Sequence, residues 1–302
     1  MVGTGKSRIT VCICTYKRPL LLKKLLEALA RQETEELFTH SVVVVDNDVL
    51  RSGESVVRDF SGTAQFEVKY CVEARQSIAL SRNKAVENAS GEFISFIDDD
   101  EFPPSFWLLT LFKTLQEHKV DGVLGPVKPS FDERAPRWVV KGGFYDRPTY
   151  PTGFVIDRAK GRTGNVLLKR SIFSASEQPF RPEFRTGEDQ DFFGRMIEKG
   201  HVFIWCDEAV AFESVPESRW KRRFMLRRAL LQGANSILHP AHKGFLVMKS
   251  VVAVPLYTAG LPIALLLGQH QFMALLVKLF DHLGKLLALA GINVVKEEYV
   301  TE

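Results

Sequence analysis

The sequence has few cysteines and only a small excess of basic over acidic residues. Four Cys in 302 residues are too few for a disulfide framework, so we expect free thiols in a reducing compartment. Lys and Arg number 40 against 36 Asp and Glu, and no basic tail accompanies this small excess, so we expect no nucleic-acid partner. The polar residues MVGTGKSR at the start of the chain predict no signal peptide.

Repeats and low-complexity tracts are also missing. With 45% hydrophobic and 25% charged residues, the composition is that of a globular protein with a sizeable core, and it excludes a disordered chain, a collagen-like repeat or a coiled coil. Charged side chains are absent from the long stretch between Ser250 and Val277. We therefore predict a soluble body at residues 1–215 and a second region at 216–302 with an apolar end.

Strand-like runs alternate with helical patterns in the first half of the chain. The runs cover 9–14, 42–45, 66–72, 93–97 and 122–127, and the helical patterns begin at Pro19 and cover 78–89 and 105–117. We interpret segment 128–162 as an insertion or lid, after which come strands at 164–169 and 202–206 and a helix at 188–199. This order predicts an α/β fold with a mostly parallel central sheet flanked by helices, and ligands at the carboxyl ends of the strands.

Three consecutive carboxylates follow the apolar strand pattern FISFI. Asp98, Asp99 and Asp100 repel one another and do not suit a core, whereas a divalent cation that also holds phosphate oxygens would suit them. The alternative is an acidic helix start ahead of Pro103 and Ser105, where the helix dipole favours negative charge. The position after a strand favours the metal site.

Acidic residues occur at two further positions that chemistry could use. Asp46 ends the second strand pattern, so in a parallel sheet it can reach the same crevice as the acids after the fourth strand. Glu188 and Asp189 open a predicted helix. They form either an acidic first turn, which the helix dipole stabilises, or a site for a general base that takes a proton from an acceptor hydroxyl.

Several longer motifs occur in one order along the chain. They are VCICTYKRP, VVVVDND, SIALSRNKAVENASGEFISFIDDDE, TGNVLLKR and TGEDQDFF. With these motifs the chain resembles family 2 glycosyltransferases of the GT-A fold over roughly residues 8–235. Within that family it is most similar to bacterial succinoglycan or exopolysaccharide-type β-glucosyltransferases, through LGPV at 124–127, APRW at 135–138 and RRF at 222–224.

The resemblance implies a nucleotide-binding set of residues. Thr15 and Asp46 would line the nucleotide pocket, and Arg82 and Asn83 would lie near the phosphates or the base. Asp98 would contact the ribose. In place of the family's usual Asp-Asp-Gly-Ser-like ending of the second strand, this chain has Asp-Asn-Asp at positions 46–48, which leaves open which of the three contacts uracil.

The resemblance also implies a metal and a catalytic base. Asp100 would coordinate Mg²⁺ or Mn²⁺ that bridges the diphosphate, and Asp189 would deprotonate the attacking hydroxyl. The donor would be a UDP-sugar, UDP-glucose in the first instance, and the anomeric centre would invert in one displacement. Arg222, Arg223, Arg227 and Arg228 would hold a diphosphate through charge-assisted bonds, or they form a solvated basic face.

The apolar end predicts contact with a membrane surface. Segment 251–268 is uncharged but contains Pro255, Gly260 and Pro262, which favours a re-entrant or interfacial segment over a clean span. Segment 272–292 has the pattern of an amphipathic helix that lies in the membrane surface. The alternative is a homodimer interface or a core helix pair. The basic stretch Arg219–Arg228 favours the cytoplasmic face of a bacterial inner membrane.

Two classes of function follow from these observations. The first is a metal-dependent, inverting glycosyltransferase that extends a polyprenyl-linked glycan for exopolysaccharide or another surface glycan. The second is a membrane-peripheral, nucleotide-binding scaffold without catalysis. A nicotinamide-dependent dehydrogenase is disfavoured, because no GxGxxG follows the first strand.

Overall fold

The computed structural model describes residues 6–175, 178–184, 187–236 and 243–292, which form two units. The first unit contains the chain up to Pro129 and from Arg147 to Ser214. The second contains Ser130–Asp146 and the chain from Val215 onward. Segment 128–162, expected as one insertion or lid, is therefore divided between the units, and it includes the short helix α5 at Arg137–Lys141 and a 3₁₀ turn at Arg158–Lys160.

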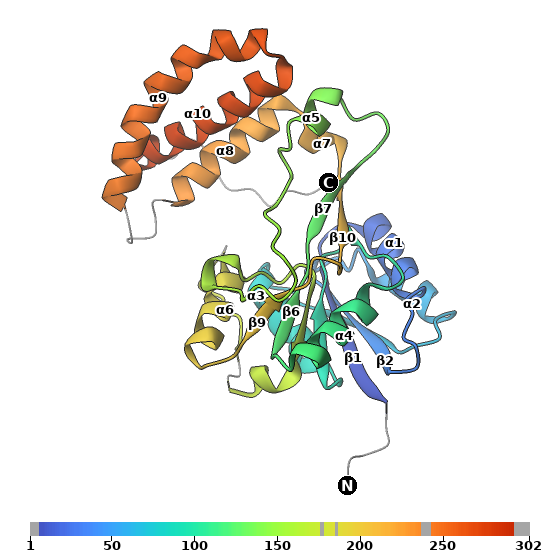
Figure 1. Ribbon diagram of the computed structural model, residues 1–302. Helices are drawn as coiled ribbons and strands as arrows, with labels where there is room; N and C mark the ends of the chain where they lie inside the picture. The colour runs from blue at the N-terminus through green and yellow to red at the C-terminus, as the bar shows by residue number, and fades with distance from the viewer. Residues whose placement is uncertain (1–5, 176–177, 185–186, 237–242, 293–302) are drawn as a thin grey trace. The chain divides into compact units, whose positions relative to one another are not determined.

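A seven-stranded sheet forms the centre of the first unit (Figure 1). Its strands lie in the order β3-β2-β1-β4-β8-β6-β9. Their bounds are β1 Ser7–Thr15, β2 Phe38–Asp46, β3 Val68–Val72, β4 Phe93–Phe96, β6 Gly122–Leu124, β8 Val166–Lys169 and β9 Phe203–Trp205. The pairs β1–β2, β2–β3, β1–β4 and β6–β9 are parallel, and β8 runs antiparallel to β4 and β6. The expected mostly parallel sheet is confirmed.

Helices cover both faces of this sheet, because side chains alternate between the two faces of each strand. Ile9, Val11 and Ile13 of β1 pack with α1 (Pro19–Leu29), α2 (Glu54–Ser61) and α4 (Trp107–His118). On the other face, Cys12 packs in a cluster with residues of α3 (Ile78–Asn88) and α6 (Glu188–Glu198). The α2 helix has only one buried side chain, Val57, and the sequence analysis did not predict it.

A small second sheet fixes the chain directly after the three aspartates. It contains β5 (Glu101–Phe102), β10 (Ala211–Val215) and β7 (Val127–Phe131), in the order β5-β10-β7. β5 pairs antiparallel with β10, and the Ser214 N–H donates to the Asp100 carbonyl oxygen at 2.9 Å. The backbone that carries Asp100 is therefore held on both sides.

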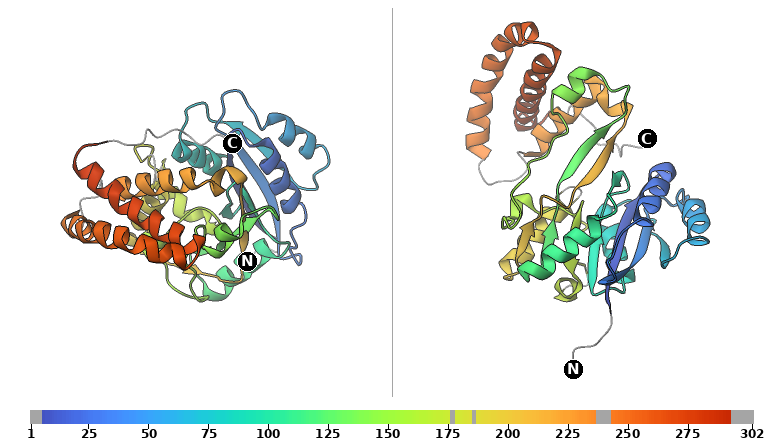
Figure 2. Two further views of the ribbon diagram at one scale, coloured as in Figure 1. Left: turned by 90° about the horizontal axis from the view of Figure 1, so that it is seen from above. Right: turned by 45° about the vertical axis from the view of Figure 1, so that its right-hand side comes forward.

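The second unit is mostly helical where the structure describes it, apart from the ends of β7 and β10 (Figure 2). It contains α5, α7 (Glu217–Trp220), α8 (Arg222–Ser236), α9 (Lys243–Leu266) and α10 (Gln269–Leu289). Its buried core is made of Val139, Tyr145, Val215, Trp220, Met225 and Met273. α8 and α10 approach closely at two glycines: a Cβ on Gly233 would overlap the carbonyl oxygen of Asp281, and one on Gly284 would overlap that of Leu230.

The two apolar segments differ from the sequence-based expectation. α9 is one continuous helix through Pro255 and Pro262, because each proline removes a single backbone hydrogen bond from a helix of 24 residues. On α10 one charged residue turns inward: Lys285 is buried and donates to the half-buried Asp281. Exposed apolar side chains instead lie mainly on α9, at Met248, Val251, Val252, Leu256, Ile263, Leu265 and Leu266.

Candidate active site

Parallel strands bring three of the predicted positions to one edge of the large sheet. Thr15, the last residue of β1, lies opposite Asp46, the last residue of β2. β4 pairs with β1 on its other side and ends at Phe96, so Asp98 follows two residues further on. Since all three strands run in the same direction, their carboxyl ends meet at the same edge.

The carboxylate of Asp46 accepts three hydrogen bonds from the protein. It is fully buried and accepts hydrogen bonds from the N–H groups of Asp48 (2.9 Å) and Gly53 (2.7 Å) and from the Tyr70 hydroxyl (2.8 Å). Asp48 is also buried, and one of its oxygens accepts from the Leu50 N–H at 3.1 Å. Asp46 therefore shapes the turn after β2, and its contact with a nucleotide stays a prediction.

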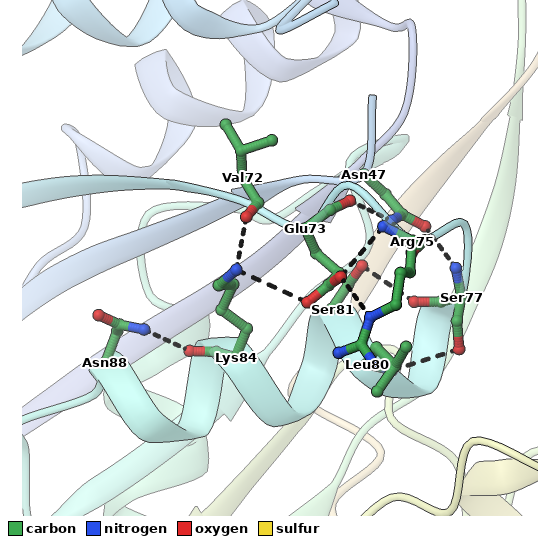
Figure 3. A network of polar contacts seen from close by, with 9 residues as sticks. All are labelled: Asn47, Val72, Glu73, Arg75, Ser77, Leu80, Ser81, Lys84 and Asn88. Atoms are coloured by element: carbon green, nitrogen blue, oxygen red, sulfur yellow. Dashed lines mark hydrogen bonds and ion pairs between the residues drawn. The ribbon is translucent and has the colours of Figure 1, made fainter. Parts of the chain in front are cut away.

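Asn47 holds the loop between β3 and α3 in place (Figure 3). Its side-chain amide donates to the carbonyl oxygens of Glu73 (2.7 Å) and Arg75 (2.8 Å), and its side-chain oxygen accepts from the Ser77 N–H (3.0 Å). Ser77 then caps α3 by accepting from the Leu80 N–H. The Asn47 side chain is thus used by the fold, and among residues 46–48 Asp48 has the most acceptor capacity left for a ligand.

The acids after β4 face a hydroxyl and a guanidinium. The Thr15 hydroxyl donates to Asp99 at 2.7 Å, and one Arg18 nitrogen donates to both Asp99 (3.0 Å) and Asp100 (3.2 Å). Burial raises the pKa of Asp99, and Arg18 and Thr15 only partly oppose it. Burial, with the charges of Asp98 and Asp99, raises the pKa of Asp100 to about 7.

Arg82 connects these acids with the start of α6. From α3 its guanidinium donates to Glu188, and a second nitrogen lies 3.8 Å from an oxygen of Asp98. Arg82 and Glu188 are both buried. Burial opposes the charge of Arg82, but Glu188 and Asp98 outweigh it and raise the pKa of Arg82. Burial raises the pKa of Glu188, which the charge of Arg82 partly offsets. The structure thus brings the 98–100 acids and the Glu-Asp pair together.

Asn83, next to Arg82 on α3, makes two hydrogen bonds to one residue. Its amide donates to the Phe180 carbonyl oxygen at 2.7 Å, and its side-chain oxygen accepts from the Phe180 N–H at 2.9 Å. The Phe180 ring in turn lies 5.9 Å from the Arg82 guanidinium carbon. Asn83 therefore positions the chain beside Arg82, and its assignment to the phosphates or base stays a prediction.

Asp189 lies on the first turn of α6, after Gly187, whose positive φ of 83° starts the helix. The side chain is half-buried, and one of its oxygens accepts from the Gln190 N–H at 2.8 Å. Its charge raises the pKa of Arg82 and opposes the lowering of the pKa of Arg162, so it lies near both. Its other oxygen has no hydrogen-bond partner among the residues that the structure describes.

Buried polar atoms without a partner gather beside Asp98. Within the described ranges they include Oε1 of Glu101, Oγ1 of Thr163, and Nε and Nη2 of Arg162. Arg162 lies over the Trp205 ring at 5.1 Å. A Cβ built on Gly164 would lie 2.8 Å from Glu101 Oε1 and 3.2 Å from Asp98. Unpaired buried polar atoms cost free energy, so this is where a hydroxyl-rich ligand would find partners.

The carboxylates fit a divalent cation in their chemistry. Mg²⁺ is usually held by one or two carboxylates together with substrate phosphates, and Asp100 offers one. The Asp98 side chain is 45% exposed, which leaves it open to a ligand. Among the described residues no three His, Cys, Asp or Glu side chains are arranged around one point as for a metal ion, and Asp100 is turned toward Arg18.

The sequence analysis assigned no role to several residues of this site. Arg18 stands in the quoted motif VCICTYKRP, and a charge directly after a strand end was a usable signal. Glu101 and Arg162 stand out only because they have buried polar atoms without a hydrogen-bond partner. The spacing of residues in the sequence does not predict this. The α8 arginines lie in the second unit, where Arg222 packs over Trp138 and Arg228 over Tyr145 at 5.7 Å each.

The chain is similar to several known proteins. The family model described as "Glycosyl transferase family 2" matches residues 10–174. The chain is 32% identical to the succinoglycan biosynthesis protein ExoM of Rhizobium meliloti, over 82% of this chain and 85% of that protein. It is 28% identical to a Campylobacter jejuni GalNAc(5)-diNAcBac-PP-undecaprenol beta-1,3-glucosyltransferase, over 36% of this chain and 35% of that one.

The fold also occurs in a solved structure. A mannosyltransferase from Pyrobaculum calidifontis, in complex with GDP-mannose and Mn²⁺, superposes with a TM-score of 0.59. The match covers 94% of this chain and 88% of that one, at 20% identity. The similarity shows a shared fold of the GT-A type.

Proposed function

We propose a specific reaction for this chain, which belongs to glycosyl transferase family 2: transfer of a sugar, glucose in the first instance, from UDP to a polyprenyl-linked glycan, with inversion at the anomeric carbon. The observation that carries the proposal is the contact of Arg82 with both Glu188 and Asp98. It joins the strand-end acids to the helix start that holds Asp189, although about ninety positions separate them in sequence.

The strand-end residues would bind the donor. Thr15 and Asp46, with Arg82, lie at the edge where the nucleotide and diphosphate are expected, and Asp98 is open to solvent for the ribose. A Mg²⁺ or Mn²⁺ ion held by Asp100 would supply the positive charge that stabilises the leaving diphosphate. The unpartnered oxygen of Glu101 would accept a hydrogen bond from a sugar hydroxyl, and the unpartnered nitrogens of Arg162 would donate to sugar hydroxyls.

Asp189 is the proposed general base. Because Glu188 is engaged by Arg82, Asp189 is the member of the pair with an oxygen left for a substrate. The Asp189 carboxylate takes the proton of the acceptor hydroxyl. At the same time the hydroxyl oxygen of the acceptor bonds to the anomeric carbon, and the bond between that carbon and UDP breaks. The attack comes from the face opposite the leaving group, so the configuration inverts in a single displacement.

The acceptor is proposed to be lipid-linked because of the second unit. Leu246–Leu266 of α9 is long and apolar enough to cross a bilayer, and only 11% of its most apolar window is buried. Exposed arginines on α8, Arg222, Arg223 and Arg227, would attract the anionic lipids of a cytoplasmic leaflet. The C. jejuni relative is named for an undecaprenol-linked acceptor. The competing explanation of the exposed apolar side chains on α9 is a homodimer in which a second copy of the chain covers this helix.

An Asp189→Asn variant tests the reaction. Wild-type protein with Mn²⁺ and vesicles that carry a polyprenyl-linked glycan should consume UDP-glucose, and the variant should lose turnover by about 10²–10⁴-fold while it still binds UDP. Glu198→Gln, at the far end of the same helix, is the matched control. Unchanged turnover in Asp189→Asn contradicts the base assignment. UDP binding without turnover by the wild type, across a panel of UDP-sugars and GDP-mannose, supports the non-catalytic scaffold instead.

A further inference from the structure

The Arg18 guanidinium lies beside Asp100, the proposed metal ligand, in the place where a bound cation would lie. One of its nitrogens donates to Asp99 at 3.0 Å and to Asp100 at 3.2 Å. The side chains of Asp99 and Asp100 are 6% and 10% exposed, and that of Arg18 is 17% exposed. Two neighbouring buried carboxylates thus share one guanidinium, which supplies the positive charge they need.

A divalent cation and this guanidinium cannot both neutralise Asp100 fully. Arg18 contacts one oxygen of Asp100, Oδ2, and two positive charges on one carboxylate repel each other in a buried site. For Asp100 to bind a cation with both oxygens and without that repulsion, Arg18 has to move away. A guanidinium forms strong bidentate bonds with phosphate oxygens, so an incoming diphosphate offers it a new partner.

The start of α1 does not depend on the Arg18 side chain. Arg18 is the residue before Pro19, at the N-terminal end of the helix, with φ −130° and ψ 54°, and its side chain makes no capping bond. Its backbone carbonyl accepts from the Leu22 N–H at 3.0 Å, so the main chain stays fixed while the side chain can change partner. The Thr15 bond to Asp99 does not involve Arg18.

We infer that Arg18 couples cation binding to nucleotide binding: without a nucleoside diphosphate it stands in for the metal at Asp99 and Asp100, and with one it turns to the phosphates and releases Asp100 to the cation. Arg18 is thus a positioning residue. The inference rests on the proposed function, because it requires a donor that carries a diphosphate. By linkage, UDP must strengthen cation binding by the same factor by which the cation strengthens UDP binding.

Titration of Mn²⁺ in the presence and absence of UDP tests this coupling. Free Mn²⁺ is followed by its electron paramagnetic resonance signal in the wild type, Arg18→Met, Arg18→Lys and the control Arg51→Met. Arg51 is an exposed arginine that pairs with Glu54 on the loop after β2. A positive charge at this distance lowers a carboxylate's affinity for a proton by one to three powers of ten. We expect the same positive charge to lower the carboxylate's affinity for a metal ion by a similar factor.

We expect Arg18→Met to bind Mn²⁺ about tenfold or more tightly without UDP, and the strengthening by UDP to shrink by a similar factor. Arg18→Lys should lie between it and the wild type, and Arg51→Met should match the wild type. Unchanged or weaker Mn²⁺ binding by Arg18→Met without UDP overturns the inference. If Arg18→Met does not fold by circular dichroism, the direction of the change in Arg18→Lys decides. A wild type that binds neither Mn²⁺ nor UDP contradicts the proposed function itself.

Discussion

At the end of β2, the buried polar side chains form hydrogen bonds with other groups of the protein. At the end of β4, several buried carboxylates lie close to one another and have fewer hydrogen-bond partners. Asp46 accepts three hydrogen bonds and Asn47 makes three more. Asp99 and Asp100 share one guanidinium, and Glu101 keeps an oxygen without a partner among the described residues. Both strand ends lie at the same edge of one sheet, and a single strand, β1, separates β2 from β4.

The difference indicates two kinds of polar residue. Satisfied buried groups stabilise a fold, because removing one leaves its partners unpaired at about 1–3 kcal/mol each. Crowded carboxylates with raised pKa values destabilise it, and such groups gather where a ligand completes them. Changes near β2 should therefore act mainly on stability, and changes near β4 mainly on ligand binding and turnover.

The largest effect is expected at the crowded end. Asp100→Asn removes the carboxylate proposed to hold the cation, so metal-dependent turnover should fall by about 10²-fold or more. The melting temperature without ligand should be unchanged or higher, because one of three repelling charges is gone. Turnover with Mn²⁺ and thermal unfolding are the two measurements. Asp59→Asn, at an exposed position on α2, serves as control. Full activity of Asp100→Asn would contradict the assignment of Asp100 as the metal ligand.

A smaller but opposite effect is expected at the satisfied end. Asn47→Ala leaves two carbonyl oxygens and one N–H without their side-chain partner, so the free energy of unfolding should fall by about 3 kcal/mol. Turnover per folded molecule should fall far less than in Asp100→Asn. Urea unfolding checks this against Asn88→Ala, which loses one bond to the Lys84 carbonyl oxygen. Equal stability of the two variants would contradict the comparison.

The smallest expected effect is a difference in pH dependence. Hydrogen bonds and charges from Arg75 and Lys84 outweigh burial and lower the pKa of Glu73, near β2, whereas burial raises the pKa of Glu188. Stability from Glu73 is therefore present above about pH 4.3 and lost as the pH falls through its lowered pKa. Stability linked to Glu188 is greatest below about pH 4.3 and declines as the pH rises through its raised pKa.

Glu73→Gln and Glu188→Gln separate these two contributions. With rising pH, the wild type should gain stability relative to Glu73→Gln and lose it relative to Glu188→Gln, each by on the order of 1 kcal/mol. Unfolding free energies measured from about pH 2.5 to 7.5 give both slopes, because the Glu73 contribution changes below about pH 4.3 and the Glu188 contribution above it. Slopes of the same sign would mean that the two ends of the sheet do not differ in the way described.

The sequence predicted the strand ends better than the contacts made there. Strand and helix periodicity located the β1, β2 and β4 ends and the start of α6, because these patterns are local. Asn165, in the motif TGNVLLKR, shows why the rest was not predicted. It has a positive φ of 55°, donates to the carbonyl oxygens of Pro126 and Ala209, and accepts from the Trp107 indole. These partners come from three distant segments, and spacing along the chain does not reveal them.

The second unit was predicted in composition but not in shape. The lack of charge between Ser250 and Val277 correctly indicated apolar helices, yet two prolines did not interrupt α9. On α10 Lys285 is buried and pairs with the half-buried Asp281, while Lys278 stays exposed, and glycines on α8 and α10 let the two helices meet. Helix periodicity alone does not tell which face meets a neighbour.

Anomalous diffraction from a crystal of the wild type with Mn²⁺ and UDP-glucose tests the central claim most directly. The account predicts a manganese peak against the Asp100 carboxylate, with the anomeric carbon facing Asp189 across the sugar. A manganese peak away from residues 98–100, or a sugar whose far side meets no part of α6, would contradict it.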